Sequence, residues 1–266
     1  MRGEIKLISV IIPCYKQEKT VVSNIKKIRN VLSRLQYAFE IIVVVDGKID
    51  NTFKRAKTVK GENIKVVGYS NNYGKGYALR YGMAKSRGNL VAFIDGGTDL
   101  NPRGLQMLLA HFEWYNADII VGSKWHPVSK VKYPWWRKIV SKTYGVLVKI
   151  LFGLRIRDTQ LGMKFFRREV LVKVLPRLLV KKWAFDIEIL SVADRLGFKR
   201  IYEAPIELDW LELESHVSKN FFRSVTEMLI DTLAVFYRLR IVKYYDDGNQ
   251  RKWKYNKKLN LRINIG

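Results

Sequence analysis

Five short runs of apolar, mostly β-branched residues alternate with segments of helical spacing in the first half of this chain. The runs cover residues 7–13, 40–46, 65–69, 90–94 and 118–122. Strands this continuously apolar are buried on both faces, which is typical of a parallel sheet covered by helices. Helices expected at 20–35, 76–85 and 103–115 supply the crossovers that parallel strands need. The sequence therefore predicts an α/β fold with a mostly parallel central sheet and helices on both faces.

Polar residues stand where three of these strands end. Pro13 and Tyr15 follow the first strand, Asp46 ends the second, and Asp95 ends the fourth. The carboxyl ends of parallel strands form the ligand crevice of an open α/β sheet, so we expect a binding site there. Asp95 and Asp99, in a Gly-rich turn, are hard oxygen ligands suited to Mg²⁺ or Mn²⁺ beside a phosphate. The structural alternative is that Asp99 caps the next helix and Asp95 braces the turn.

Two further motifs carry cations. Lys75 lies between two glycines just before a helix, where backbone N–H groups and a Lys suit a diphosphate. The spacing is neither the P-loop pattern nor the Rossmann fingerprint. Segment 157–168 combines Asp158 and Gln160 with Lys164 and several arginines, whose charges could neutralise phosphate. A surface turn before a strand would use similar residues.

Asp186 and Glu188 fall in the first turn of a helix expected at 185–196. Carboxylates at this position interact favourably with the helix dipole, which accounts for one acid more readily than for two. No Gly-x-Ser-x-Gly turn occurs, and Cys14 is the only cysteine. The sequence therefore gives no support to a hydrolase triad, and Cys14 is interpreted as a small buried residue rather than a nucleophile.

The charge balance predicts an anionic partner. There are 49 Lys and Arg against 24 Asp and Glu, a formal net charge of +25. Nucleic acid, an acidic membrane surface and a phosphorylated substrate all fit such an excess, although some organisms simply favour Lys-rich surfaces. A single cysteine indicates a reducing compartment. We see no signal peptide and no apolar run of about 18 residues, so we expect no spanning helix.

The second half is less regular. We expect a helix at 133–154, a strand at 200–208 and a helix at 222–241. The first of these helices is amphipathic and basic. Its apolar face is expected to carry Trp135, Trp136, Val140, Tyr144, Leu147 and Leu151, and the opposite face Lys138, Lys142 and Lys149. Such a helix is typical of a membrane interface, and equally of a packed helix with a solvated Lys face.

The expected domain organisation is a single domain followed by a tail. The domain covers 1–242, with a nucleotide-sugar half at about 1–124 and an acceptor and membrane-surface half at 125–242. Residues 243–266 form a basic aromatic tail with Tyr244, Tyr245, Trp253 and Tyr255. Such a tail could lie on a membrane surface or be a solvated chain end.

The order of the motifs resembles that of family 2 glycosyltransferases of the GT-A fold. The matching stretches are 9–15, 43–47 with 50–52, 74–80, 92–95, 121–123 and 158–164. The nearest branch is similar to the dolichyl-phosphate glucosyl- and mannosyltransferases, and 185–188 with 209–219 resemble the glucosyl branch. The resemblance covers about residues 5–240.

The resemblance implies roles for individual residues. The implied nucleotide-sugar ligands are Pro13, Tyr15, Glu18, Asp46, Lys75 and Asp95. The implied metal ligands are Asp95 and Asp99, and the catalytic set is these two with Asp158 and Lys164, the latter facing phosphates. The acceptor side would include Lys124, Gln160, Asp186 and Glu188. Two departures stand out: Val45 precedes a single Asp46 where paired acids are usual, and Gly97 replaces the second acid of Asp-x-Asp.

The implied reaction moves a hexose from a nucleotide sugar, of the UDP-glucose or GDP-mannose type, to a polyprenyl or dolichyl phosphate. The enzyme would be peripheral to the cytoplasmic face of a membrane with an anionic surface. A phosphate acceptor is already anionic and needs little help from a base. A saccharide or protein hydroxyl is the alternative acceptor, with Asp186 or Asp158 as base. A third alternative is a basic membrane or nucleic-acid module, but no RNA-binding signature occurs and no nucleic acid is expected. The sugar, the base, the lipid length and the oligomeric state stay open.

Overall fold

The structure is a computed structural model that describes residues 4–97, 100–132, 135–209, 221–248, 253–256 and 261–264. Its strands are β1 Leu7–Cys14, β2 Ala38–Asp46, β3 Ile64–Tyr69, β4 Leu90–Ile94, β5 Ile119–Ser123, β6 Lys130–Lys132, β7 Met163–Arg167, β8 Ile201–Pro205, β9 Glu207–Asp209, β10 Trp253–Asn256 and β11 Leu261–Asn264. Its helices are α1 Val21–Leu32, α2 Thr52–Ala56, α3 Lys75–Lys85, α4 Gly104–Trp114, α5 Trp135–Phe152, α6 Arg168–Val174, α7 Phe185–Arg195 and α8 Phe221–Phe236. A 3₁₀ turn, η1 Leu175–Arg177, follows α6, and a π-helical turn, η4 Tyr237–Ile241, follows α8.

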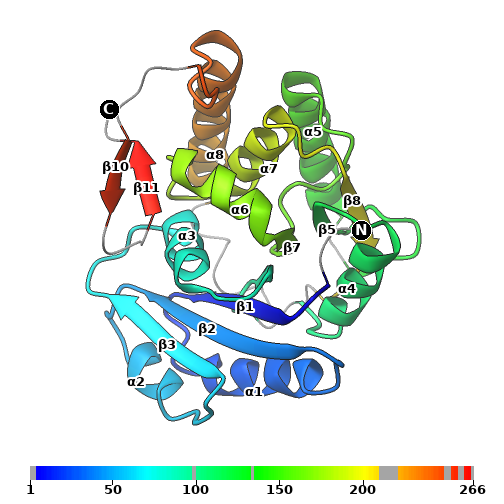
Figure 1. The fold of residues 1–266 in the computed structure, drawn as a ribbon. Coiled ribbons are helices and arrows are strands. Elements are labelled where there is room, and N and C mark those ends of the chain that lie inside the picture. Colours follow the sequence, from blue (N-terminus) through cyan, green and yellow to red (C-terminus); the bar gives the residue numbers. More distant parts are fainter. Residues whose placement is uncertain are drawn as a thin grey trace.

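A seven-stranded sheet forms the centre of the molecule, in the order β3-β2-β1-β4-β7-β5-β8 (Figure 1). The paired strands are parallel except β7, which runs antiparallel to both β4 and β5. The predicted α/β class with a mostly parallel sheet is confirmed. The five strands expected in the first half are all present.

Strand β7 was not predicted. Its sequence, Met163 to Arg167, is short and carries two cations, so segment 157–168 was interpreted as a polar motif in a turn. In the structure β7 is inserted between β4 and β5, pairing Met163 with Ile94 and Lys164 with Phe93 and Val121. The insertion brings Lys164 into the middle of the sheet beside the end of β4.

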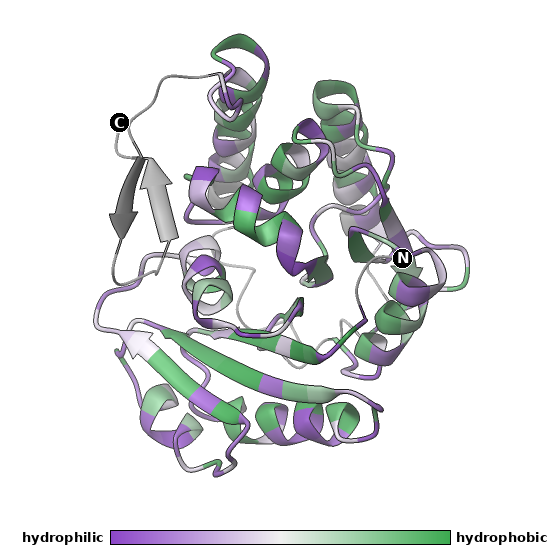
Figure 2. Cartoon of the chain, viewed as in Figure 1, coloured by the Kyte–Doolittle hydropathy of each residue, from purple (hydrophilic) through white to green (hydrophobic). Residues whose placement is uncertain are grey.

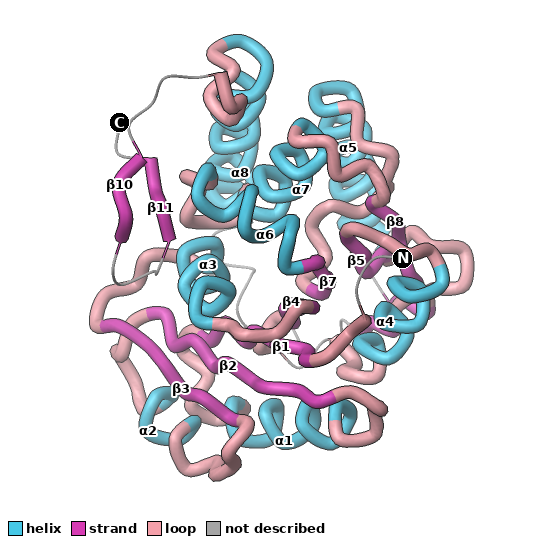
Figure 3. Tube along the Cα trace, in the orientation of Figure 1, coloured by secondary structure: helices cyan, strands magenta, loops and turns pink. Residues whose placement is uncertain are grey.

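Helices cover both faces of the sheet, as predicted. Helices α1, α2 and α4 pack on one face, and α3, α5, α6, α7 and α8 on the other. The strands between them are largely hydrophobic (Figure 2), and Figure 3 shows the helices and strands along the chain trace. Helix α3 lies directly on the sheet, since a Cβ added at Gly82 would overlap the side chain of Ile11. This close approach fixes the C-terminal half of α3 against β1 and β2.

Helices α5 and α8 lie side by side away from β1–β3 (Figure 1). The Tyr144 hydroxyl lies 2.8 Å from the Thr232 hydroxyl, and the rings of Phe152 and Phe236 meet edge to face. Tyr144, on the apolar face predicted for α5, is thus buried against α8, as the packed-helix alternative expects. Other apolar side chains on α5, and on α8 with η4, are exposed and form two stripes. The α5 stripe is Trp135, Ile139, Val146 and Ile150; the α8 stripe is Ile230, Leu233, Tyr237 and Ile241.

The predicted tail does not begin at residue 243. Tyr244 and Tyr245 are buried, and the Tyr245 hydroxyl donates to Glu188 at 2.7 Å. Arg195 pairs with Asp246 at 2.6 Å. These contacts make residues 243–247 part of the packed fold, and β10 and β11 form a hairpin beyond them. No helix among the described residues combines the length and apolar character needed to cross a bilayer.

The central sheet draws strands from both predicted halves, with β1–β5 from the first and β7 and β8 from the second. The division near residue 124 remains a prediction.

Candidate active site

The loops after β1 and β2 are joined to one another. The Gln17 N–H donates to the Thr52 hydroxyl at 2.8 Å, and the Asn51 N–H donates to the Glu18 carboxylate at 3.1 Å. Tyr15 on the first loop is 43% exposed. The structure thus brings the predicted nucleotide ligands Tyr15 and Glu18 to one edge of the sheet, with the ring of Tyr15 accessible from solvent.

Asp46 lies at the same edge but is buried, and both of its oxygens are bonded. They accept the N–H groups of Tyr73 and Gly74 at 2.8 and 2.9 Å. Gly74 has φ +99°, a conformation that favours glycine. The carboxylate thereby fixes the backbone that presents Lys75 at the start of α3. This positioning role was missed in the sequence, where Asp46 was interpreted only as a nucleotide ligand.

Asp95 emerges from β4 into a turn that is held on three sides. Its N–H donates to the Gly162 carbonyl at 2.8 Å, and a Cβ at Gly162 would overlap the Asp95 carboxylate. A Cβ at Gly96 would lie 2.7 Å from the Pro13 carbonyl oxygen. Buried Asn24 on α1 donates to the Gly96 carbonyl at 2.6 Å. These contacts fix the position of the Asp95 backbone and carboxylate.

Four charged side chains form a continuous series from Asp95 into the core. The ammonium of Lys75 lies 2.8 and 2.9 Å from the two oxygens of Asp95, and 3.6 Å from Asp186. The ammonium of Lys164 lies 2.6 Å from the other oxygen of Asp186 and donates to the Leu161 carbonyl. Exposure falls along the series, from 33% for the Asp95 side chain to 0% for Lys164. We call Lys75, Asp95, Lys164 and Asp186 the charged cluster.

Burial and partners act in opposite directions on the two lysines. Burial disfavours the charge of Lys75, but the carboxylates of Asp95 and Asp186 outweigh it and raise the pKa of Lys75 above its usual value. Burial lowers the pKa of Lys164, although Asp186 opposes the change. Because Lys164 is fully enclosed, the prediction that it faces phosphates directly is wrong. It acts on the site by fixing Asp186.

Asp158 is also buried and is bound by Lys124. The Lys124 ammonium lies 2.8 and 3.0 Å from its oxygens, and the Lys124 N–H donates to it at 3.1 Å. Burial alone would raise the pKa of Asp158, but the charge and hydrogen bonds of Lys124 hold it below its usual value. The two predicted residues are therefore brought together as an ion pair. Gln160 follows, with its N–H donated to Asp158 at 3.1 Å.

Glu188 does not belong to an acceptor surface. Its side chain is fully buried, and its oxygens accept the N–H groups of Leu179 and Val180 and the hydroxyl of Tyr245. The carboxylate ties α7 to the preceding loop and to the chain end. The resemblance had implied an acceptor role for Glu188 together with Asp186.

The arginines of segment 157–168 are mostly structural as well. Arg167 donates to the Ala117 carbonyl at 2.7 Å, and Arg168 donates to the Gly88 carbonyl at 2.6 Å. These bonds fix the end of β7 and the start of α6. Arg167 and Arg168 therefore bind backbone carbonyls, and the expectation that they neutralise phosphate is not met.

The predicted metal site is described only for Asp95, since Asp99 lies outside the described residues. Within that part of the chain, no three His, Cys, Asp or Glu side chains are grouped to hold a metal ion. One oxygen of Asp95 lies 2.8 Å from Lys75 without a directed hydrogen bond, whereas the other accepts one. Mg²⁺ commonly binds through one or two carboxylates together with substrate phosphates and water. The residues present fit a hard divalent cation of that kind.

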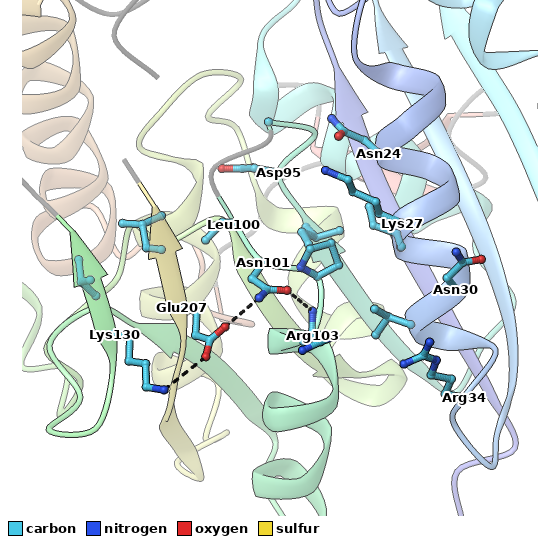
Figure 4. Close-up of a pocket in the computed structure, with 17 residues that line it drawn as sticks. Asn24, Lys27, Asn30, Arg34, Asp95, Leu100, Asn101, Arg103, Lys130 and Glu207 are labelled. Atoms are coloured by element: carbon cyan, nitrogen blue, oxygen red, sulfur yellow. Dashed lines mark hydrogen bonds and ion pairs between the residues drawn. The ribbon is translucent and has the colours of Figure 1, made fainter. Parts of the chain in front are cut away.

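A groove of about 800 Å³ opens beside Asp95 (Figure 4). Helix α1 forms one wall, with Asn24, Lys27, Asn30 and Arg34, and the paired strands β6 and β9 form the other, with Lys130 and Glu207. Asn101 crosses its base and donates to Glu207 at 2.8 Å. The exposed cations along the groove suit an anionic substrate.

A sheet of this order, with a carboxylate at the end of β4 and a cation at the start of α3, is the arrangement expected of a glycosyltransferase of the GT-A fold. Residues 9–175 match the family model described as glycosyl transferase family 2, and the chain belongs to this family. The predictions of family, fold class and enzyme type are confirmed.

Several curated relatives share a name. A dolichyl-phosphate β-glucosyltransferase of Homo sapiens is 33% identical over 228 residues, which is 79% of this chain and 68% of the relative. One of Dictyostelium discoideum is 29% identical over 246 residues, or 87% of this chain and 74% of the relative.

Solved structures agree in fold. Glucosyl-3-phosphoglycerate synthase of Mycobacterium tuberculosis, crystallised with Mn²⁺, UDP and phosphoglyceric acid, has a TM-score of 0.64 and 20% identity; the match covers 98% of this chain and 87% of that one. Mannosyl-3-phosphoglycerate synthase of Rubrobacter xylanophilus has a TM-score of 0.67 and 16% identity, covering 95% and 82%.

Proposed function

We propose that this chain transfers glucose from UDP-glucose to a dolichyl or related polyprenyl phosphate. The names of the relatives support the sugar and the lipid acceptor, and the UDP in the similar structures supports the donor. The observation that carries the proposal is Asp95, held at the open end of β4 with the cation of Lys75 beside it. A carboxylate and an ammonium so placed suit a metal-bound diphosphate leaving group.

The proposed mechanism stabilises the leaving diphosphate. Asp95, with Asp99 as the further predicted ligand, would hold Mg²⁺ or Mn²⁺, which as a Lewis acid would neutralise charge on the departing diphosphate. Lys75 adds a positive charge on the same side. The acceptor phosphate brings its own negative charge, so attack on the sugar needs no strong base.

The state of the two candidate bases supports a phosphate acceptor over a hydroxyl. Asp158 is paired with Lys124, and Asp186 is paired with Lys164. The charge of Lys124 holds the pKa of Asp158 below its usual value, so Asp158 is a weak base. Both oxygens of Asp186 already face an ammonium group, that of Lys164 or that of Lys75. A hydroxyl acceptor would need one of these pairs to open first.

We further propose that the enzyme works at the surface of a membrane, on its cytoplasmic face. The α5 stripe and the α8 stripe expose apolar side chains beside Lys138, Lys142 and Lys149. Aromatic and aliphatic side chains flanked by lysines suit the boundary between headgroups and acyl chains. The net charge of +25 supports attraction to anionic lipids.

The test is a transfer assay with labelled UDP-glucose or GDP-mannose and dolichyl phosphate, followed by solvent extraction. We expect label in the lipid phase with UDP-glucose. Asp95→Asn should reduce the rate at least about a hundredfold, since electrostatic stabilisation of the leaving group is a large part of catalysis. The matched control is Asp194→Asn, which alters an exposed pair with Lys199 on α7.

Two results would overturn parts of the proposal. Label found only in water-soluble products would exclude the lipid acceptor. An undiminished rate in Asp95→Asn would exclude the metal and diphosphate role of that residue.

A further inference from the structure

We propose that Lys75 is an internal counter-cation that occupies Asp95 in the metal-free enzyme and moves to Asp186 when a metal-bound nucleoside diphosphate enters. The inference rests on the proposed function, because it takes Asp95 as the metal ligand. It adds that the chain itself carries the competitor for that metal.

The first observation is that Lys75 covers both oxygens of Asp95. Its ammonium lies 2.8 and 2.9 Å from them, so a divalent cation and Lys75 would compete for the same lone pairs. Two positive charges that close repel strongly in a partly buried site. Binding of the metal to Asp95 therefore requires Lys75 to leave or to change position.

The second observation is that acids enclose Lys75. Its side chain is only 16% exposed, and its ammonium lies beside Asp95 and 3.6 Å from Asp186. The geometry therefore describes an ammonium group between two carboxylates, which yields to the metal by moving from one towards the other.

The third observation is a second acceptor already in place. Asp186 has one oxygen bound to Lys164 at 2.6 Å and the other 3.6 Å from Lys75. Because Lys164 is fully buried, Asp186 is held where it is. A small rotation of the Lys75 side chain closes the longer gap without moving any carboxylate.

The backbone of Lys75 is fixed, so the movement is confined to the side chain. Asp46 binds the Tyr73 and Gly74 N–H groups, and the Tyr77 N–H donates to the Lys181 carbonyl at 3.1 Å. A Cβ at Gly76 would lie 2.7 Å from the Cβ of Phe185, which shows how closely α3 meets α7. These contacts leave the flexible stem of Lys75 as the moving part.

The net charge of the charged cluster explains when the movement of Lys75 is favourable. Two carboxylates and two ammonium groups cancel in the metal-free state. A divalent cation alone would leave two uncompensated positive charges in a partly buried site. A nucleoside diphosphate supplies the missing negative charge. We therefore infer that the enzyme takes the metal weakly on its own and tightly as the metal–UDP complex.

The experiment measures Mn²⁺ affinity with and without UDP, by the electron paramagnetic resonance signal of free Mn²⁺. Lys75→Met should bind Mn²⁺ alone at least about tenfold more tightly than the unchanged protein, since the competitor is gone. The enhancement of Mn²⁺ affinity by UDP should be correspondingly smaller in this variant. The matched control is Lys199→Met, which breaks the Lys–Asp pair with Asp194 away from Asp95 and should leave Mn²⁺ affinity unchanged.

A second measurement follows Lys75 in the unchanged protein and uses the variant only to assign the signal. The side-chain ¹³Cε resonance of Lys75, assigned with Lys75→Met, should shift on adding Mg²⁺ with UDP and stay in place with Mg²⁺ alone. Equal Mn²⁺ affinity in Lys75→Met and the unchanged protein, or a Lys75 resonance that ignores Mg²⁺ with UDP, would overturn the inference. Failure of every protein to bind Mn²⁺ even with UDP would instead overturn the proposed function.

Discussion

At the scale of single residues, the site depends on positions where a side chain is absent. Asp95 packs against Gly162, where the absence of a Cβ leaves space for the carboxylate. The next residue, Gly96, lies against the Pro13 carbonyl. The acids and cations could be identified from the sequence, because the charge of a side chain follows from its residue type. The sequence did not single out Gly162, since the need for glycine there arises only when segment 157–162 is folded onto β4.

Gly162→Ala should therefore damage the site more than the fold. The added methyl group would overlap the Asp95 carboxylate and displace it from Lys75. We expect a loss of at least about tenfold in transfer rate, the scale of a misplaced catalytic group. The same assay on Gly248→Ala is the control, because nothing lies within 4 Å of a Cβ there. Equal rates for the two variants would contradict the assigned packing of Gly162.

At the scale of elements, β7 and the pair α5 and α8 differ most from expectation. Five buried strands were predictable from apolar runs alone. Strand β7 was not, because an antiparallel strand between β4 and β5 takes its stability from both neighbours rather than from its own pattern. For α5, periodicity predicted an apolar face but not which part of it α8 would cover.

The α5 stripe gives a prediction about membrane binding. Replacing both Ile139 and Ile150 with Glu should weaken binding to anionic liposomes by about tenfold or more, since burying one such side chain is worth about 1.5–3 kcal/mol. Both are well exposed in the structure, so the fold should be unaffected. Co-sedimentation with liposomes measures the effect. Val172→Glu, an exposed apolar position on α6, is the control. A loss of binding no greater than in the control would exclude the α5 stripe as the contact.

At the scale of the whole molecule, the excess of positive charge makes the buried carboxylates important for stability. The pKa of Asp158 is held low by Lys124 against the effect of burial. The pKa of Glu40 is likewise held low, against burial, by Ser9 and Arg87. Groups of this kind stabilise the fold above their ordinary pKa, and that stabilisation is lost as the pH falls through the lower folded value. Glu188, whose pKa burial raises, has the opposite sign and offsets part of the effect.

We therefore expect the free energy of unfolding to fall as the pH is lowered below about 4.5, the region of the ordinary Asp and Glu values. Asp158→Asn should make this decline shallower. At neutral pH it should cost about 3 kcal/mol, because Lys124 is left buried without its partner. Urea unfolding at a series of pH values measures both effects. An identical pH dependence in Asp158→Asn would show that the pair does not contribute.

The sequence by itself determined the class of fold, the edge of the sheet where the candidate site lies and the sign of the charge that we expect to bind there. These follow from local patterns, because strand burial, strand ends and net charge are all properties of short stretches or of composition. Only the tertiary structure decided which charged residues work together. Lys75, Asp95, Lys164 and Asp186 belong to α3, the end of β4, β7 and α7, four elements that are distant in the chain. Lys164 reaches Asp186 beside the end of β4 because β7 is inserted there. The same packing removed Glu188 from the acceptor side and placed Tyr245 in the core. Burial and pairing depend on neighbours that no single stretch of sequence contains.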